Sequence, residues 1–439
     1  MRRGRIRRAM LGGLQPSAAV WESTAPIRSE LFSAERLEAH GRSLAEAHGP
    51  GVPARGRLLG RRLADNEAML LEAYRDTVAT LDLGAAITPA GEWLIDNFHL
   101  IEKQIRELRL DLPPKYYRQL PKIAAGHLAG YPRVFGVAWA FVAHTDSLFD
   151  SDLLCRFLRA YQETQPLTIG ELWAVAITLR LVLVENLRRI AERIVLSRAA
   201  RTEADGCADR LLGVADRSPE PPSEVLRDRK GPLADAFVAQ LSQRLRGHDA
   251  ASAPVQTWLD ERLARQGASA DQLLRDEQQR QISASITVRN IVRSMRLISD
   301  VDWADLVERV SLVNDVLNSG CAFADMDFAT RNLYRNAIEE LARGSGVGEL
   351  EIARRVVRAI SEVDDLSGEG CRCDPGYYLV AAGRRDFERT LGFHAPLRLW
   401  PERAIRALGV WAYAGPSSPA PPCSWPLGSP PWRRRAWPP

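Results

Sequence analysis

The amino-acid sequence predicts a mostly α-helical fold, a multi-helix bundle that ends in a disordered Pro-rich C-terminal tail. Apolar residues recur three and four positions apart over most of the chain, and helix start signals precede these runs. The period of two that marks a half-buried strand is almost absent. At 439 residues with 46% hydrophobic residues, the chain can bury the cores of two or three domains.

The first predicted helices follow recognisable start signals. Ser33 is suited to cap a helix, because its hydroxyl can accept a hydrogen bond from the first turn. A loop rich in Gly, Pro and Arg leads to a second helix over 63–81. Thr88 and Pro89 form the next start signal, and we expect one helix from there to Asp111. Its apolar residues at helical spacing are Trp93, Ile101, Ile105 and Leu108.

A long helix is predicted over 165–193. Thr168 is its N-cap, and Glu171 three residues later completes a capping box. From 172 to 184 the helix is apolar nearly all round, interrupted by Arg180 and one threonine, and charged residues follow at i,i+3 and i,i+4 spacing. We therefore expect a buried first half and a second half that reaches solvent.

Helical periodicity resumes near Ile282. Apolar residues form one face up to Ile298 and a second face from Trp303. Thr330 is expected to cap a further helix that stops at the Gly-Ser-Gly sequence ending in Gly346. The residues expected to face inward from this last helix are Leu333, Ala337, Ile338 and Leu341.

Composition divides the chain into five parts. Residues 1–25 are an Arg-rich leader expected to be disordered, and 26–200 form a helical domain. The Ser-, Pro- and Asp-rich segment 201–275 is expected to be a flexible, partly helical connection, and 276–414 form a second helical part. Residues 415–439 mix prolines with tryptophans and arginines, as a GC-rich gene read out of frame would. We favour a frameshifted terminus there, with a natural disordered tail as the alternative.

Charge and cysteine content narrow the function classes. The 59 basic residues are nearly balanced by 55 acidic ones, so the net charge of +4 argues against a nucleic-acid partner. Six cysteines show no framework spacing, and Cys371 and Cys373 form a C-x-C without a second pair. We expect no metal site and a reduced, cytoplasmic setting. No stretch reaches the ~18 apolar residues of a membrane span, and the basic N-terminus has too short an apolar part for a signal peptide.

Four blocks of sequence resemble the N-terminal helical region of the cyclic β-1,2-glucan synthases. They are GELWAVAITLRLVLVENLRR, EWLIDNFHLIEKQIRE, YYRQLPKIAAGHLAGYPRVFGVAWAFVAHTD and MDFATRNLYRNAIEELA, starting at Gly170, Glu92, Tyr116 and Met326. The resemblance runs from about Pro26 to about Leu399. It implies a part of a large bacterial inner-membrane glucosyltransferase that makes cyclic β-1,2-glucan from UDP-glucose with a divalent cation.

The resemblance also implies which parts of such an enzyme lie elsewhere. The transferase carboxylates belong to a separate α/β domain downstream, and membrane helices begin soon after the region that matches 384–413. We therefore expect a non-catalytic segment, truncated before those domains, that scaffolds the transferase on the cytoplasmic side of the inner membrane. Its partners would be the downstream transferase and membrane domains and the membrane surface. The alternative is a free-standing helical interaction module without enzymatic activity.

Several motifs invite a catalytic or metal-binding interpretation, but helix chemistry explains them better. Asp325 and Asp327 form a D-x-D, the motif that holds a metal ion against a nucleotide sugar, yet they directly precede a helix, where the dipole favours acidic residues. His144, Asp146 and Asp150 lack further ligands at a recognisable spacing, so either aspartate is expected to cap the next helix.

A second possible ligand pair is explained in the same way. His99 and Glu102 lie at i,i+3, but no second copy of this pair appears, so they are expected on a helix surface.

The remaining candidates for a substrate contact are Tyr116, Tyr117 and Arg180. The two tyrosines belong to an aromatic run that could stack on a sugar, whereas Trp139 in the same run is expected in the core. Arg180 interrupts an apolar helix surface, so it needs a partner. We favour an ion pair within the bundle, with a cleft or a lipid phosphate as the alternative. The sequence identifies no catalytic residue, no cofactor site and no metal site.

Overall fold

The computed structural model describes residues 23, 25–49, 56, 59–84, 86–111, 114–214, 218–226, 232–246, 249–265, 267–320, 322–362 and 373–394. These residues form α-helices and one 3-10 helix, η1 (Ala322–Asp325), and contain no β-strand. The mostly helical fold is therefore confirmed. The predicted tail over 415–439, Cys371 and nearly all of the leader over 1–25 lie outside the described residues.

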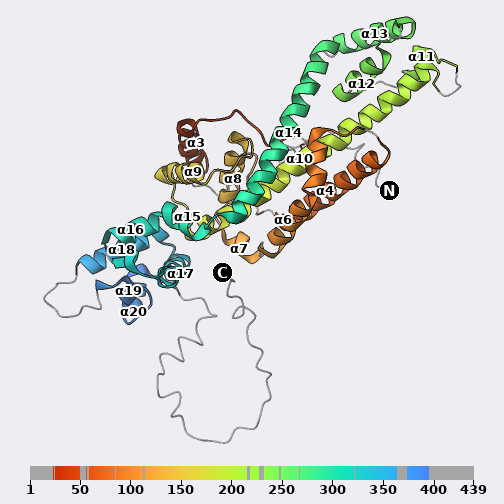
Figure 1. Cartoon of the computed structure of the whole chain (residues 1–439). Coiled ribbons are helices and arrows are strands. Elements are labelled where there is room, and N and C mark those ends of the chain that lie inside the picture. The colour runs from red at the N-terminus through yellow and green to blue at the C-terminus, as the bar shows by residue number, and fades with distance from the viewer. Residues whose placement is uncertain are drawn as a thin grey trace, which may run out of the picture.

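A single helix, α10 (Ile169–Leu212), forms the axis of the molecule (Figure 1). Its 44 residues extend for about 66 Å at 1.5 Å per residue. The predicted capping box is confirmed, because Thr168 accepts from the Glu171 amide and the Glu171 carboxylate accepts from the Thr168 amide. The helix continues well past residue 193, and Gly213 in the left-handed conformation ends it. A second long helix, α14 (Ala270–Asp300), runs beside it.

The largest cluster of buried apolar side chains surrounds the first half of α10. The helices that contribute to it, besides α10 and α14, are α3 (Ala34–Ala47), α4 (Leu59–Asp82), α5 (Pro89–Asp96), α6 (Phe98–Asp111), α7 (Pro114–Gln119), α8 (Arg133–His144), α9 (Ser151–Thr164) and α15 (Trp303–Val310). The predicted caps Ser33, Thr88 and Asp150 are confirmed, because each side chain accepts a hydrogen bond from the first turn of its helix.

A second cluster lies beyond the N-terminus of α10, at the lower left of Figure 1. Its helices are α16 (Leu312–Gly320), α17 (Phe328–Ser345), α18 (Glu349–Ser361), α19 (Pro375–Leu379) and α20 (Arg384–Leu391). Ile169, the first residue of α10, is the link, since it belongs to this cluster while Leu172 belongs to the first.

A third cluster lies at the opposite end of α10, at the upper right of Figure 1. It falls within 201–275, the segment expected to be a flexible, partly helical connection. Here the last turns of α10 pack with α11 (Pro222–Val225), α12 (Asp235–Leu245) and α13 (Asp249–Ala264) around Phe237 and Leu241, which are almost fully buried. The described residues of this segment are therefore mostly helical and have an apolar core of their own.

Two details of the predicted helices are wrong. The helix expected from Pro89 to Asp111 is broken into α5 and α6 at Asn97, whose side-chain amide donates to the Trp93 carbonyl and so competes with the helical backbone. Thr330 is not a cap, because α17 begins two residues earlier. Asp327 is the N-cap there, and its carboxylate accepts from the Thr330 amide.

The predicted inward face of α17 is also wrong at one position. Leu333 is 51% exposed, whereas Ala337, Ile338 and Leu341 are buried as expected. Tyr334 lies next to it in the sequence and takes the inward position instead. The predicted stop at Gly346 is confirmed by its left-handed conformation.

Candidate functional site

The N-terminus of α10 is a buried ionic junction between the first two cores. Glu171 is completely buried, and both of its carboxylate oxygens accept from the Arg133 guanidinium at 2.9 and 2.5 Å. Arg133 also donates to the Pro166 carbonyl at 2.8 Å. The capping glutamate therefore has two roles, since it closes the helix end and neutralises a buried guanidinium.

The two candidate tyrosines lie beside this junction on α7. The Tyr116 hydroxyl donates to the carbonyl of Gly170, in the first turn of α10. Tyr117 is only 7% exposed, and its ring meets that of Tyr116 edge to face at 5.6 Å. Burial raises the pKa of both phenols, so both stay protonated at neutral pH. A role for either residue in substrate binding stays a prediction.

Glu349, which the sequence did not single out, reaches the same junction. It begins α18, and its carboxylate accepts from the backbone N–H of Ile169 at 2.6 Å. Burial raises its pKa to about 7, although the bond from Ile169 opposes the shift. The charges of Glu339 and Glu171 add to the increase. The second core is thus fastened to α10 through a carboxyl group that titrates near neutrality.

Arg180 has the partner that the sequence favoured. Its guanidinium lies 3.7 Å from the Glu107 carboxylate, and its side chain is 14% exposed. The ion pair joins α10 to α6 within the bundle, so the first of the two predicted environments for this arginine is confirmed.

The three motifs that could have held a metal ion lie on different elements of the structure. Asp325 ends η1 while Asp327 caps α17, and His99 and Glu102 are exposed on the surface of α6. The His144 ring stacks on the Phe32 ring, with ring centroids 3.9 Å apart. In the part of the chain that the structure describes, no group of three or more His, Cys, Asp and Glu side chains could hold a metal ion.

A buried charge cluster contradicts the expectation for the second half of the helix predicted over 165–193, which is the middle part of α10. Glu185 is 1% exposed and receives hydrogen bonds from Arg62, Arg188 and Arg189, at 2.8 to 3.0 Å. Burial raises the pKa of Glu185, but the bond from Arg62 and the three positive charges outweigh it and hold the pKa low. The predicted exposure of these charges is wrong because the chain supplies partners far away in the sequence.

Two cavities flank the segment 25–29, which is fastened to α10. The Ile27 amide donates to the Asn186 side chain at 2.6 Å, and Arg189 donates to the Ala25 carbonyl at 2.9 Å. Pro26, Arg28 and Ser29 line both cavities, so the segment separates them.

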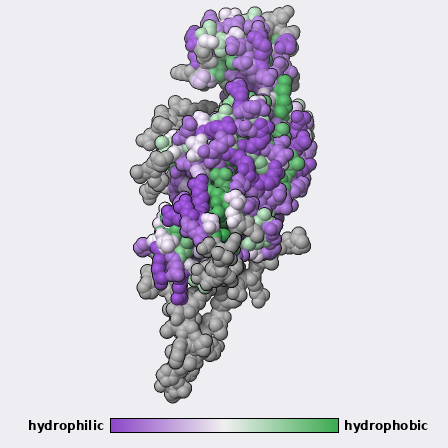
Figure 2. Space-filling model, turned by 90° about the vertical axis from the view of Figure 1, so that its left-hand side faces the viewer, coloured by the Kyte–Doolittle hydropathy of each residue, from purple (hydrophilic) through white to green (hydrophobic). Residues whose placement is uncertain are grey.

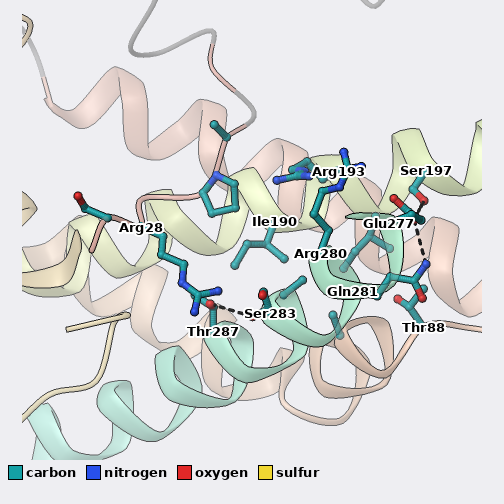
Figure 3. Close-up of a pocket in the computed structure, with 16 residues that line it drawn as sticks. Arg28, Thr88, Ile190, Arg193, Ser197, Glu277, Arg280, Gln281, Ser283 and Thr287 are labelled. Carbon is teal, nitrogen blue, oxygen red and sulfur yellow. Dashed lines mark hydrogen bonds between the residues drawn. The ribbon is translucent and has the colours of Figure 1, made fainter. Parts of the chain in front are cut away.

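The first cavity, of 530 Å³, lies between α5, α10 and α14 and is shown in Figure 3. We call it the arginine cavity, because Arg28, Arg193 and Arg280 line it.

The second cavity, of 520 Å³, is the histidine cavity, lined by His40, His48, His127 and His144. Burial lowers the pKa of His40 and His127, and it lowers that of His48 to about 4. Trp139 also lines it, with the Arg189 guanidinium 4.9 Å from its ring centroid. Trp139 packs against the first core, as the sequence predicted, but it is only partly buried.

In the described part of the chain, these features define a helical protein with three apolar cores, each of which contains residues of one long helix, and a buried ionic junction between the first two. Among the described residues, no helix combines the length and apolar character needed to cross a membrane. No protein-family model matches the chain.

The chain is similar to the cyclic beta-(1,2)-glucan synthase NdvB of Rhizobium meliloti (strain 1021), with 38% identity over 408 residues. The match covers 92% of this chain and 14% of the length of that relative. The resemblance to cyclic β-1,2-glucan synthases is thereby confirmed, and it concerns one part of such a protein.

Proposed function

We propose that this chain is a non-catalytic helical segment of a cyclic β-1,2-glucan synthase-like glucosyltransferase, and that it scaffolds the transferase domain at the membrane. The observation that carries the proposal is the course of α10, which links three apolar cores along about 66 Å within a chain that is 38% identical to such a synthase. A long helix that packs into an apolar core at each end fixes the distance between those cores, as a scaffold must.

In this proposal the chemistry belongs to other parts of the enzyme. UDP-glucose and a divalent cation would bind the transferase domain, and this segment would contact that domain, the membrane domains and the cytoplasmic membrane surface. On the face shown in Figure 2, hydrophilic residues dominate and apolar residues form narrow strips between them. The proposed contact with the membrane would therefore be peripheral.

A replacement experiment tests the scaffold role. In the Rhizobium relative, the matched region would be deleted or exchanged for this chain, and cyclic β-1,2-glucan would be measured in cells. We expect the deletion to abolish synthesis and the exchange to restore a substantial part of it. Normal synthesis after the deletion, with the transferase still at the membrane, would overturn the proposal.

A second experiment tests the absence of catalysis. The purified chain would be incubated with radiolabelled UDP-glucose and Mg²⁺ or Mn²⁺, with the whole relative in membranes as the positive control. We expect no release of UDP and no labelled glucan. Turnover that persists after further purification would show that the segment itself is an enzyme.

The free-standing interaction module remains the second candidate, and two strongly exposed leucines help to separate the alternatives. Leu83 is 85% exposed and Leu110 is 71% exposed. A free module should stay monodisperse without detergent despite them. A segment that needs its parent enzyme should bind detergent, and replacing both leucines by glutamine should reduce that binding.

A further inference from the structure

In the part of the chain that the structure describes, the arginine cavity contains one guanidinium that no carboxylate pairs with. Arg28 lies 3.5 Å from the Asp146 carboxylate, and Arg280 forms an ion pair with Asp235. Arg193 forms no ion pair or hydrogen bond with any residue that the structure describes. Figure 3 shows its guanidinium close to that of Arg280, at one side of the cavity.

Glu277, the one carboxylate among the described residues that line this cavity, already has partners. Glu277 Oε1 accepts from Ser197 at 3.2 Å, from Arg201 at 3.0 Å and from Gln281 at 2.9 Å. Its negative charge is therefore already paired with Arg201, and Glu277 forms no ion pair with Arg193. Arg28 and Arg280 each have their own carboxylate, so among the described residues Arg193 is the cavity arginine without one.

The surroundings of Arg193 make its unpaired positive charge energetically unfavourable. The side chain is partly buried, and burial lowers the pKa of its guanidinium. Repulsion from Arg280 lowers it further, against weaker attraction from Glu277 and Asp235. A ligand that brings a negative charge would remove this repulsion, and charge-assisted hydrogen bonds to a guanidinium are among the strongest in proteins.

The rest of the wall has a different chemistry. Apolar groups of Pro26, Ile190, Ile194 and Ala284 line the cavity between the arginines. The hydroxyls of Ser283 and Thr287 lie near Arg28 (Figure 3). Apolar walls with a few placed polar groups are typical of pockets that bind small molecules. The volume of 530 Å³ is also within the range of such pockets.

We propose that the arginine cavity binds an anionic amphiphile, whose phosphate or carboxylate head pairs with Arg193 and whose apolar body contacts Ile190, Ile194 and Ala284. The head can belong to a soluble molecule or to a membrane lipid, since both present the same chemistry. This inference is independent of the proposed scaffold role.

Three probes test the two halves of the site on the full chain. Hexyl phosphate carries head and body, inorganic phosphate the head alone, and hexanol the body alone. By titration calorimetry we expect hexyl phosphate to bind at least tenfold more tightly than either of the others, because each half contributes about 1.4 kcal/mol or more. Equal affinity for hexyl phosphate and inorganic phosphate, or no binding of either, overturns the proposal.

Variants then locate the site. Arg193→Gln should weaken hexyl phosphate binding about tenfold or more, whereas Arg289→Gln, the same change at an exposed position of α14, should leave it unchanged. Ala284→Phe should fill the apolar wall and remove the advantage of hexyl phosphate over inorganic phosphate. If both variants lost the same affinity for hexyl phosphate, the ligand would not bind at Arg193 and the proposal would be wrong.

The fold of the key variant can be monitored independently. Because Arg193 has no hydrogen-bond or ion-pair partner among the described residues and is repelled by Arg280, Arg193→Gln should raise the Tm of the unliganded chain by about 1–2 °C. A large fall in Tm would mean that Arg193 is structural, and this would contradict the proposal.

A vesicle assay separates the two sources of the ligand. The chain would be sedimented with vesicles of phosphatidylcholine alone or with added phosphatidic acid. Loss of binding to the acidic vesicles in Arg193→Gln, with Arg289→Gln unaffected, assigns the site to a lipid head. If Arg193→Gln loses hexyl phosphate but keeps vesicle binding, the ligand is a soluble amphiphile.

Discussion

Two ion-pair clusters on α10 have charged residues at the same i,i+4 spacing but opposite surroundings. Near the middle of the helix, Glu185 is 1% exposed and is shared by three guanidiniums. Near its end, Asp205 and Asp209 pair with Arg244 of α12, and all three side chains are about 40% exposed or more. The difference teaches that the spacing of charges along a helix does not reveal their energetic role. That role depends on which other elements cover them.

The largest expected loss of stability follows a substitution in the buried cluster around Glu185. Glu185→Gln would remove the buried carboxylate that Arg62, Arg188 and Arg189 share. Breaking a buried ion pair costs about 3–5 kcal/mol. The loss would be measured as a fall in the free energy of unfolding in urea. Asp205→Asn is the matched control at the exposed cluster, where the cost should stay below about 1 kcal/mol. Similar losses in the two variants would contradict the comparison.

The next largest effect is a dependence of stability on pH, which arises at the junction of the first two cores. The folded-state pKa of Glu349 is raised to about 7 from 4.5, so the folded state holds the proton more tightly than the unfolded state. Its contribution is complete below pH 4.5 and is lost as the pH rises through 7. We expect unfolding free energy to fall by about 3 kcal/mol at most between pH 4.5 and 8, as each pKa unit corresponds to about 1.4 kcal/mol.

Two variants isolate this titration from the rest of the chain. Glu349→Gln keeps a neutral acceptor for the Ile169 amide and should flatten the pH dependence. Glu351→Gln, two residues later on α18, removes a carboxylate that pairs with Arg355 at a half-exposed position and should leave the pH dependence in place. An unchanged slope in Glu349→Gln would assign the effect to other groups.

The smallest effect compares two helix caps. Thr168 caps α10 at the partly buried junction, and Ser269 caps α14 at an exposed position. Thr168→Ala should cost about 1–2 kcal/mol and Ser269→Ala about 0.5–1 kcal/mol, within the range measured for caps. Urea unfolding of both variants measures the two losses of unfolding free energy. A greater loss in Ser269→Ala than in Thr168→Ala would contradict this prediction.

Local chemistry explains which parts of the fold were predictable. The caps at Ser33, Thr88, Asp150 and Thr168 depend on residues within one turn, so the sequence displays them directly. The break at Asn97 was missed because the apolar spacing continues across it. It depends on a side-chain bond to the Trp93 carbonyl, and the helical pattern does not report that bond.

Most of the candidate site depends on contacts between distant segments. The bond between Glu349 and the Ile169 amide spans 180 residues, and Glu185 meets Arg62 across 123 residues. Nothing near Glu349 distinguishes it from an ordinary acidic residue in a first helical turn. Arg180 was an exception, because a charge on an otherwise apolar surface requires a partner even before the partner is known.

The continuity of α10 fixes the angular position of its two ends. Each residue of an α-helix turns the chain by 100° and advances it by 1.5 Å. One residue inserted between the first and third cores would therefore rotate the third core by more than a quarter turn. Because α14 packs on both α10 and α12, it would lose its register on one of them. The number of residues in α10 is thus coupled to that in α14, and the two lengths can change only together.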